Sequence, residues 1–409
     1  MEGLRKASGK YFLGESDVQI LCLEVRRMRE DFPYFRGNDG VYFDNASTTQ
    51  KPEKVIKAVE SYLSEASNVG RGSYSLANKT GKKVEESRVK IADFIGADKK
   101  EIVFTSGATE SLNMIPELIS EDINDGQKIL VSEEAHKSTR RPWMKLKETL
   151  AKQGKEITIK EYSVLETGDP DIDEIIEKAD ESTYLISVTH IHNAYGGKAE
   201  VKRLIEGLEY RPLISLDACQ SIAHVPIDVK EMEIDFLSFS GHKMFASTGT
   251  GGLYINEEIH EKIGDYQVGG GYTGDIPERL ETGTPNVSGI LSMKAAIEYI
   301  EEIGIEKIRE RNLELTQYLI ERLEGKVKFE KGPYYANCDD VGYGIISFSI
   351  ENLSAKDIGF ILDSSGIYVR DGKHCREKGK NSVRISLQAY NTEEEIDKLI
   401  ESIGNISGF

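Results

Sequence analysis

The sequence predicts an α/β protein with a larger domain built on a mostly parallel sheet and a smaller α+β domain. Two observations predict this. Short apolar runs that are typical of strands alternate with amphipathic helical stretches along the whole chain, without repeats or low-complexity linkers. The 409 residues, 39% of them hydrophobic, are also enough to fill two cores.

Two helices come first in the predicted order. Lys51-Pro52 begins one of them, since proline is well tolerated in a first helical turn, and a second runs from Thr80 until Gly96 stops it. Each has apolar residues recurring on one face, which predicts a core contact and not a site. These residues are Val55, Ile56, Val59, Tyr62 and Leu63 in the first, and Val84, Ile91, Phe94 and Ile95 in the second.

The sheet of the larger domain is expected between Ile102 and Tyr254. After it, residues 292–324 favour helix, and residues 345–350 and 383–387 are predicted to be antiparallel strands of the smaller domain. We therefore expect a large domain over 37–295 and a small domain over 1–36 and 296–409, in which the N-terminal segment packs on the C-terminal α+β part. No function is predicted for residues 1–22.

Lys243 is the most informative candidate residue. It follows the apolar run 232–239, has His242 beside it and precedes the glycine loop 248–252. Lysines normally lie on solvated helix faces, so a lysine at this place suggests a desolvated amine that can condense with an aldehyde such as that of pyridoxal phosphate, PLP. A loop lysine that reaches water is an equally good interpretation of this motif alone.

Other strand ends supply the remaining parts of a PLP site. Asp217 ends an apolar run and can pair with the ring nitrogen, and Gln220 can bond the phenolic oxygen; helix capping is the alternative for Asp217. The turn 106–110, with Thr109, joins a strand to a helix, whose N-terminus favours a phosphate. His136 and Asn193 also follow strands, and ligands of open α/β sheets bind at this carboxyl edge.

Together these motifs resemble the class V, fold-type I, PLP-dependent aminotransferase family, and within it the group II cysteine desulfurases and selenocysteine lyases. The resemblance runs from about Asp31 to the C-terminus and implies a large domain with a sheet of the seven-stranded type. The matching segments are VYFDNASTTQKP at 41–52, TSGATE at 105–110, AH at 135–136, HN at 192–193, LDACQSIAHVPID at 216–228, FSGHK at 239–243, ETGTPN at 281–286, RDGKHC at 370–375 and VR at 383–384.

The resemblance implies a role for each candidate residue. Lys243 forms the Schiff base with PLP, and His136 stacks on the ring and can relay a proton. Thr284 reaches the phosphate from a second subunit, which implies a homodimer. The other expected cofactor contacts are Ala108, Thr109, Asn193, Asp217, Gln220, Ser240 and His242; Arg384, Arg370 and Asn193 are expected to bind the substrate.

Cys375 decides which reaction we expect. Its loop is rich in cations and glycine, which favours a thiolate, although an incidental surface cysteine is the alternative. Its position matches the family's sulfur-accepting cysteine, and Arg384 would hold the substrate carboxylate with two hydrogen bonds unless it pairs with a neighbouring acid. The predicted activity is removal of sulfur from L-cysteine, which gives L-alanine and a persulfide on Cys375 for an acceptor protein.

Two alternatives stay open: a class V aminotransferase or another PLP lyase acting on cysteine sulfinate or selenocysteine, and a non-catalytic scaffold. The formal net charge of −18 argues against general binding to nucleic acids or anionic membranes. The four cysteines, Cys22, Cys219, Cys338 and Cys375, suggest neither disulfides nor a metal site, and no signal peptide or membrane span is recognisable, so a cytoplasmic protein is expected.

Overall fold

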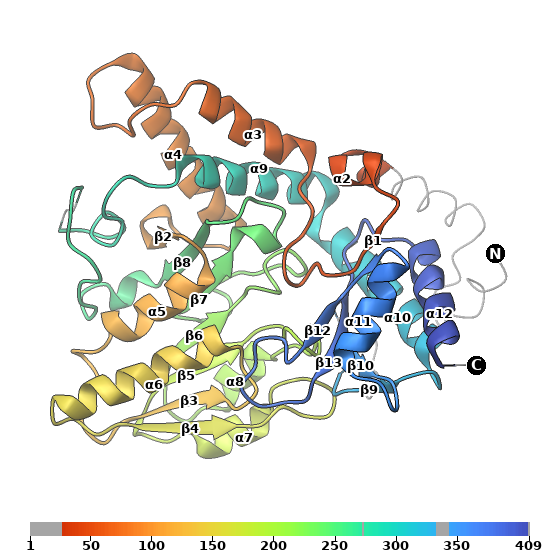
Figure 1. Ribbon diagram of the computed structural model, residues 1–409. Helices are drawn as coiled ribbons and strands as arrows, with labels where there is room; N and C mark the ends of the chain where they lie inside the picture. Colours follow the sequence, from red (N-terminus) through yellow and green to blue (C-terminus); the bar gives the residue numbers. More distant parts are fainter. Residues whose placement is uncertain (1–26, 272–273, 333–342, 408–409) are drawn as a thin grey trace.

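The computed structural model describes residues 27–271, 274–332 and 343–407, and Figure 1 shows how their elements are arranged. The expectations for residues 1–26, Cys22 and Cys338 fall outside these residues.

Within the described residues, the larger sheet has seven strands in the order β2-β8-β7-β6-β5-β3-β4. Strands β4, β3, β5, β6 and β7 run parallel, and only β8 is antiparallel to its two neighbours. The predicted mostly parallel sheet is confirmed. Its strands are β2 (Ile102–Thr105), β3 (Lys128–Ser132), β4 (Thr158–Tyr162), β5 (Thr183–Thr189), β6 (Leu213–Asp217), β7 (Phe236–Ser240) and β8 (Gly251–Ile255).

Helices cover both faces of this sheet, as apolar parallel strands require (Figure 1). One face packs against α5 (Ala108–Leu118) and α6 (Lys137–Lys152). The opposite face packs against α4 (Ser75–Phe94), α7 (Ile172–Lys178), α8 (Val201–Gly207) and α9 (Val287–Ile303). Alternate strand residues supply the two cores, for example Val131 to the first and Leu130 to the second.

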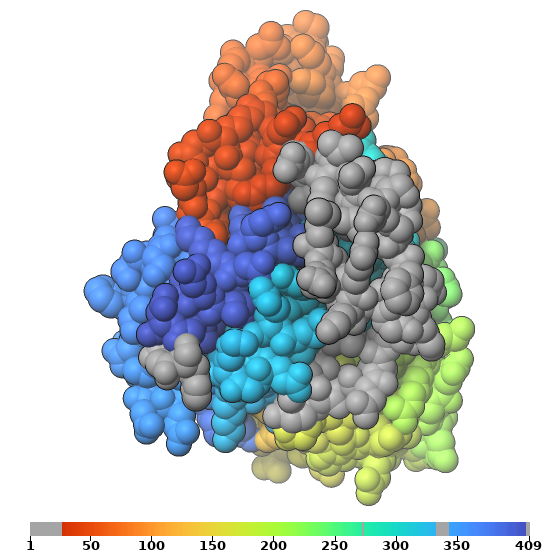
Figure 2. Space-filling view, turned by 90° about the vertical axis from the view of Figure 1, so that its right-hand side faces the viewer, coloured from red at the N-terminus to blue at the C-terminus, as the bar shows by residue number. Residues whose placement is uncertain are grey.

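A second, four-stranded sheet has the order β12-β13-β10-β9. The predicted antiparallel pair is present in it, because Ile346 of β10 lies opposite Ile385 of β13. Helices α10 and α12 lie on one outer surface of this part of the molecule (Figure 2). The elements are β9 (Lys328–Phe329), β10 (Ile345–Ser349), β12 (Arg370–Gly372), β13 (Ser382–Ser386), α10 (Ile305–Leu323), α11 (Ala355–Ser364) and α12 (Glu393–Ser407).

An N-terminal segment joins this second part. Strand β1 (Val41–Tyr42) pairs in parallel with β11 (Ile367–Tyr368), and Asp44 forms a bridge with Ser386. Around it lie α2 (Pro33–Gly37) and α3 (Glu53–Ser64), the latter packed on α9. After this pairing, the chain continues toward the large sheet, where Thr48 and Thr49 contact the turn after β7. The domain boundaries given above stay a prediction.

Three local expectations differ from the structure. Helix α4 begins at Ser75 and not at Thr80. The helical stretch 292–324 is two helices, because Gly304, at a φ of 94°, interrupts it. Gly251 and Gly252 begin strand β8 instead of lying in a loop.

Candidate active site

Strands β2, β3, β5, β6 and β7 end at one edge of the large sheet, and a cavity of about 210 Å³ lies there. Every predicted site residue except Thr284 lines it. The lining residues are Ala46, Ser47, Ala108, Thr109, Leu112, His136, Ser138, Thr189, Ile191, Asn193, Asp217, Cys219, Gln220, Ser240, His242, Lys243, Arg370, His374, Cys375 and Arg384.

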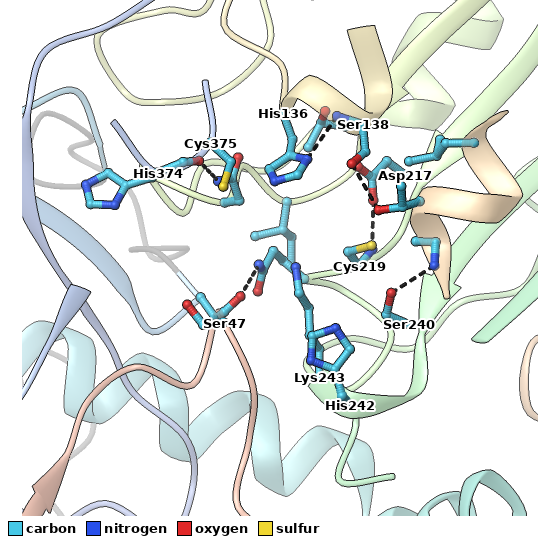
Figure 3. A pocket seen from close by; sticks show the side chains of 18 of the residues that line it. Ser47, His136, Ser138, Asp217, Cys219, Ser240, His242, Lys243, His374 and Cys375 are labelled. Carbon is cyan, nitrogen blue, oxygen red and sulfur yellow. Dashed lines mark hydrogen bonds between the residues drawn. The ribbon is translucent and has the colours of Figure 1, made fainter. Parts of the chain in front are cut away.

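Lys243 enters the cavity from a short 3₁₀ turn, Gly241–Lys243, that directly follows β7 (Figure 3). The carbonyl of His242 holds this turn in place, because it accepts hydrogen bonds from the Thr49 N–H at 3.0 Å, the Thr48 hydroxyl at 3.1 Å and Lys51 Nζ at 2.9 Å. The lysine backbone is thereby fixed from the N-terminal segment, while its side chain faces the cavity.

One end of the cavity suits a phosphate. Helix α5 starts there, after Gly107 at a φ of 144°, a conformation that side chains rarely adopt. The Ala108 N–H donates to Ser240 Oγ at 2.9 Å, and the hydroxyls of Thr109 and Ser138 are 3.0 Å apart. Amides and hydroxyls at a helix N-terminus favour an anion.

The middle of the cavity presents a carboxylate. Asp217, at the end of β6, accepts a hydrogen bond from the Thr139 hydroxyl at 2.7 Å and one from the Cys219 N–H at 3.0 Å. These bonds fix the carboxylate at the cavity wall. Gln220 beside it donates to the Ala46 carbonyl at 2.9 Å. Burial, together with the charge of Asp217, raises the pKa of Cys219, so this thiol stays protonated.

His136 caps helix α6 and faces the same cavity (Figure 3). Its Nδ1 accepts a hydrogen bond from the Ser138 N–H at 3.1 Å, which places the proton of the neutral ring on Nε2. Burial, followed by the charge of Lys243, lowers the pKa of His136 to about 4. The imidazole is therefore neutral at pH 7 and free to stack on an aromatic ring.

Cys375 lies across the cavity from the sheet, on the loop between β12 and β13. Arg370 Nη2 contacts its Sγ at 3.0 Å. The loop backbone is held on both sides: Asn193 Nδ2 donates to the His374 carbonyl at 2.9 Å, and the Lys137 N–H donates to the Cys375 carbonyl at 3.0 Å. The positive charge of Arg370 therefore lies directly beside the sulfur.

Arg384, on β13, is only 2% exposed, and burial lowers its pKa to about 10. Its Nη2 donates to Asp44 Oδ1 and to Ser47 Oγ, both at 2.9 Å, and its Nη1 donates to the Asn193 carbonyl at 2.8 Å. Arg384 therefore pairs with an acid, Asp44, as the alternative interpretation of this arginine expected. Nε has no partner among the described residues, so this buried N–H donor is unused.

The sequence motifs assigned no role to Ser47, which lines the cavity, or to Asp44, which pairs with the lining residue Arg384. Ser47 bonds both Arg370 and Arg384, and Asp44 pairs with Arg384. The segment 41–52 is part of the family resemblance, but the pairing of β1 with β11, far apart in the chain, places these two side chains beside the arginines. Thr284 does not line the cavity of its own chain.

The family model for class-V aminotransferases matches residues 41–399, which includes all of this site. The chain belongs to this family. Its enzymes are PLP-dependent, and the cavity fits that cofactor: a carboxylate, a lysine and a helix N-terminus converge, and the buried Asn193 Oδ1 and Thr189 Oγ1 have no partner among the described residues.

Relatives from this family span almost the whole chain. A probable cysteine desulfurase of Methanothermobacter thermautotrophicus is 34% identical over 95% of this chain and 100% of its own length, and one of Pyrococcus abyssi is 35% identical over 91% and 95%. A solved apo cysteine desulfurase from Thermococcus onnurineus is 32% identical with a TM-score of 0.86, and covers 94% of this chain and 98% of its own. Among the described residues, no helix is long and apolar enough to cross a membrane.

Proposed function

We propose that this protein is a PLP-dependent cysteine desulfurase that converts L-cysteine to L-alanine and collects the sulfur on Cys375. One observation carries the proposal: Lys243, from the large sheet, and Cys375, from the C-terminal part, line one cavity. An aminotransferase needs the lysine but has no use for a thiol on the opposite wall.

The cofactor contacts follow from the arrangement of the cavity. Ala108, Thr109, Ser240 and His242 would hold the phosphate, and Asp217 the ring nitrogen. Gln220 would reach the phenolic oxygen, with His136 stacked on the ring and Asn193 at its edge. Lys243 would hold the aldehyde covalently until a substrate amine replaces it. When bound, PLP supplies an electron sink for the bonds at the substrate Cα.

Arginines would orient the substrate. Arg384 and Arg370 share Ser47 as a hydrogen-bond acceptor, so their guanidiniums lie together beside the thiol. A substrate carboxylate bound to Arg384 replaces hydrogen bonds that Asp44 and Ser47 make in the structure. The substrate side chain then extends toward Cys375.

The chain's own groups can carry out the transfer. Lys243, released as a free amine, takes the proton from the substrate Cα as a general base. The Cys375 thiolate attacks the substrate sulfur, so that an S–S bond forms while the Cβ–S bond breaks. The electron pair of that bond stays with the three-carbon fragment, which takes up protons and leaves as alanine. Cys375 is left as a persulfide.

We further infer a cytoplasmic homodimer that hands this sulfur to an acceptor protein. In the dimer, Thr284 of the partner subunit would add a phosphate contact, because Thr284 is not part of its own cavity. Sedimentation of the PLP-loaded protein tests the dimer: a monomer with full activity would contradict it.

The deciding experiment incubates PLP-loaded protein with cysteine, cysteine sulfinate, selenocysteine and other amino acids, and quantifies alanine against keto acid. Alanine together with a persulfide mass increase on Cys375 supports the proposal. Keto acid without alanine establishes a transaminase, alanine from selenocysteine or cysteine sulfinate alone establishes another lyase, and no product from any amino acid leaves the scaffold interpretation.

A further inference from the structure

A buried ionic cluster lies directly beneath the Cys375 loop, outside the cavity. Arg376 is fully buried, with Nη1 3.0 Å from Glu134 Oε2 and in contact with the Tyr195 hydroxyl. That hydroxyl donates to the same Glu134 oxygen at 2.5 Å, and Lys331 Nζ lies 3.0 Å from the other carboxylate oxygen. None of these four residues is used by the proposed chemistry.

Three residues of the cluster come from separate loops around the cavity. Glu134 follows β3, two residues before His136; Tyr195 follows β5, two residues after Asn193; Arg376 is the residue after Cys375. The guanidinium of Arg376 also stacks over the Tyr195 ring at 4.5 Å. The nucleophile loop is therefore tied to the same two loops that carry the expected ring contacts.

The loop wraps around this guanidinium. Arg376 Nε and its backbone N–H both donate to the Lys373 carbonyl at 3.1 Å, which closes the turn that contains the cysteine. On the far side, Gly379, at a φ of 101°, packs so close that a Cβ there would come within 2.7 Å of Arg376 Nη1. The residues of the loop thus pack around the side chain of Arg376.

The backbone of the turn needs such support. His374 and Cys375 have φ values of 52° and 60°, a left-handed conformation that costs free energy for residues other than glycine and persists only where the surroundings hold it. Burying a guanidinium is also unfavourable unless it is paired. Glu134 supplies the counter-charge, so the ion pair and the strained turn depend on each other.

We propose that Arg376, with Glu134 and Tyr195, is a positioning device that holds the Cys375 thiol over the cavity. This proposal rests on the proposed function in one respect: it assumes that the thiol is positioned for sulfur transfer. Because neither Arg376 nor Glu134 touches the substrate, their loss slows the attack by Cys375 and leaves the binding of cysteine and PLP intact.

The test compares Arg376→Met, Glu134→Gln and the double variant in the PLP-loaded protein. We expect kcat for alanine release to fall at least tenfold in each, KM for cysteine to change less than threefold, and the double variant to be no slower than the slower single one, since both remove one device. Hydrogen exchange of the amides of residues 374–378 should become at least tenfold faster in all three. This readout does not need turnover.

Arg141→Met is the matched control. Arg141 also pairs with the Cys375 loop, through Glu377 at 2.7 Å, but from an exposed position, and its loss should leave kcat and exchange within twofold. Should Arg376→Met fail to fold, Arg376→Lys and Tyr195→Phe take its place, with the same expected split of kcat from KM.

Two results would overturn the inference: unchanged exchange at residues 374–378 in a folded variant, or a kcat loss matched by an equal loss of PLP or cysteine binding. If the unmodified protein releases no alanine from cysteine, the proposed function fails. The exchange measurements then still decide whether the cluster holds the loop.

Discussion

The two nucleophiles of the cavity are prepared in different ways. Lys243 is fixed through its backbone, by the bonds to the His242 carbonyl, and its amine faces the cavity. Cys375 is fixed through backbone carbonyls on both sides and has a guanidinium at its sulfur. Burial and the charge of Asp217 raise the pKa of Cys219, a second thiol in the same cavity, which disfavours its nucleophilic thiolate form.

Lys243→Ala should abolish covalent attachment of PLP, because no other amine lines the cavity described here. Borohydride reduction and peptide mapping should find the pyridoxyl group on position 243 of the unmodified protein and nowhere in the variant, with alanine release reduced by about 10³-fold or more. Lys262→Ala, which removes an exposed lysine, should change nothing. A pyridoxyl adduct at another lysine of the unmodified protein would contradict the assignment.

Arg384→Lys should raise KM for cysteine by about 10- to 100-fold, since a charged hydrogen bond contributes roughly 1.5–3 kcal/mol and a lysine cannot replace a planar fork. Initial rates of alanine release over a range of cysteine concentrations give KM. Arg36→Lys, at an exposed ion pair with Glu53, is the control. An unchanged KM would assign carboxylate binding to Arg370 alone.

At the scale of elements, side-chain caps determine where several helices begin. Asn286 caps α9 by accepting from the Gly289 N–H at 3.1 Å, and it also donates to the Gly249 carbonyl at 2.7 Å, in the loop before β8. The start of α4 has no such signal, because Tyr74 at its N-cap makes no side-chain bond, and the sequence placed that start five residues too late.

Asn286→Ala should lower the free energy of unfolding by about 1–2 kcal/mol, the usual contribution of a cap. Urea unfolding followed by circular dichroism measures the change. Ser354→Ala removes a cap of α11 that accepts from the Asp357 N–H at 3.2 Å but holds no distant loop, so its effect should be the smaller. Equal effects would show that the Gly249 contact contributes nothing.

For the whole molecule, buried histidines make the free energy of unfolding depend on pH below neutrality. Burial lowers the pKa of His190 and His192 to about 3 and that of His224 to about 4, from 6.5. At acidic pH the unfolded chain therefore binds more protons than the folded chain. The free energy of unfolding is not reduced by these histidines well above pH 6.5, and it decreases as the pH falls from there toward 4.

The urea midpoint should accordingly be nearly flat between pH 8.5 and 7.5, begin to decrease near pH 7 and continue to decrease to pH 5, before most carboxylates of the unfolded chain titrate. His224→Asn should reduce that slope. A midpoint that rises on acidification would contradict the assignment of these rings as neutral.

The sequence predicted the sheet, its helices and most of the cavity because these depend on local patterns: apolar strands that end in a polar residue, and glycine turns before helices. It missed what long-range packing decides. The β1–β11 pair brings Asp44 and Ser47 to Arg384, and Glu134 pairs with Arg376, which lies 242 residues later in the chain. Both pairings join residues far apart in the chain, so no local pattern shows which residues meet.

The pairing of Val41 with Ile367 also has a consequence for biosynthesis. A ribosome makes the first partner more than three hundred residues before the second, which at about 5–20 residues per second leaves the early strand waiting on the order of tens of seconds. Arg384 and Cys375 emerge later still than most of the cofactor contacts. A nascent chain truncated before residue 367 therefore lacks one wall of the pocket, and the competent catalyst can arise only after Arg384 has been synthesised.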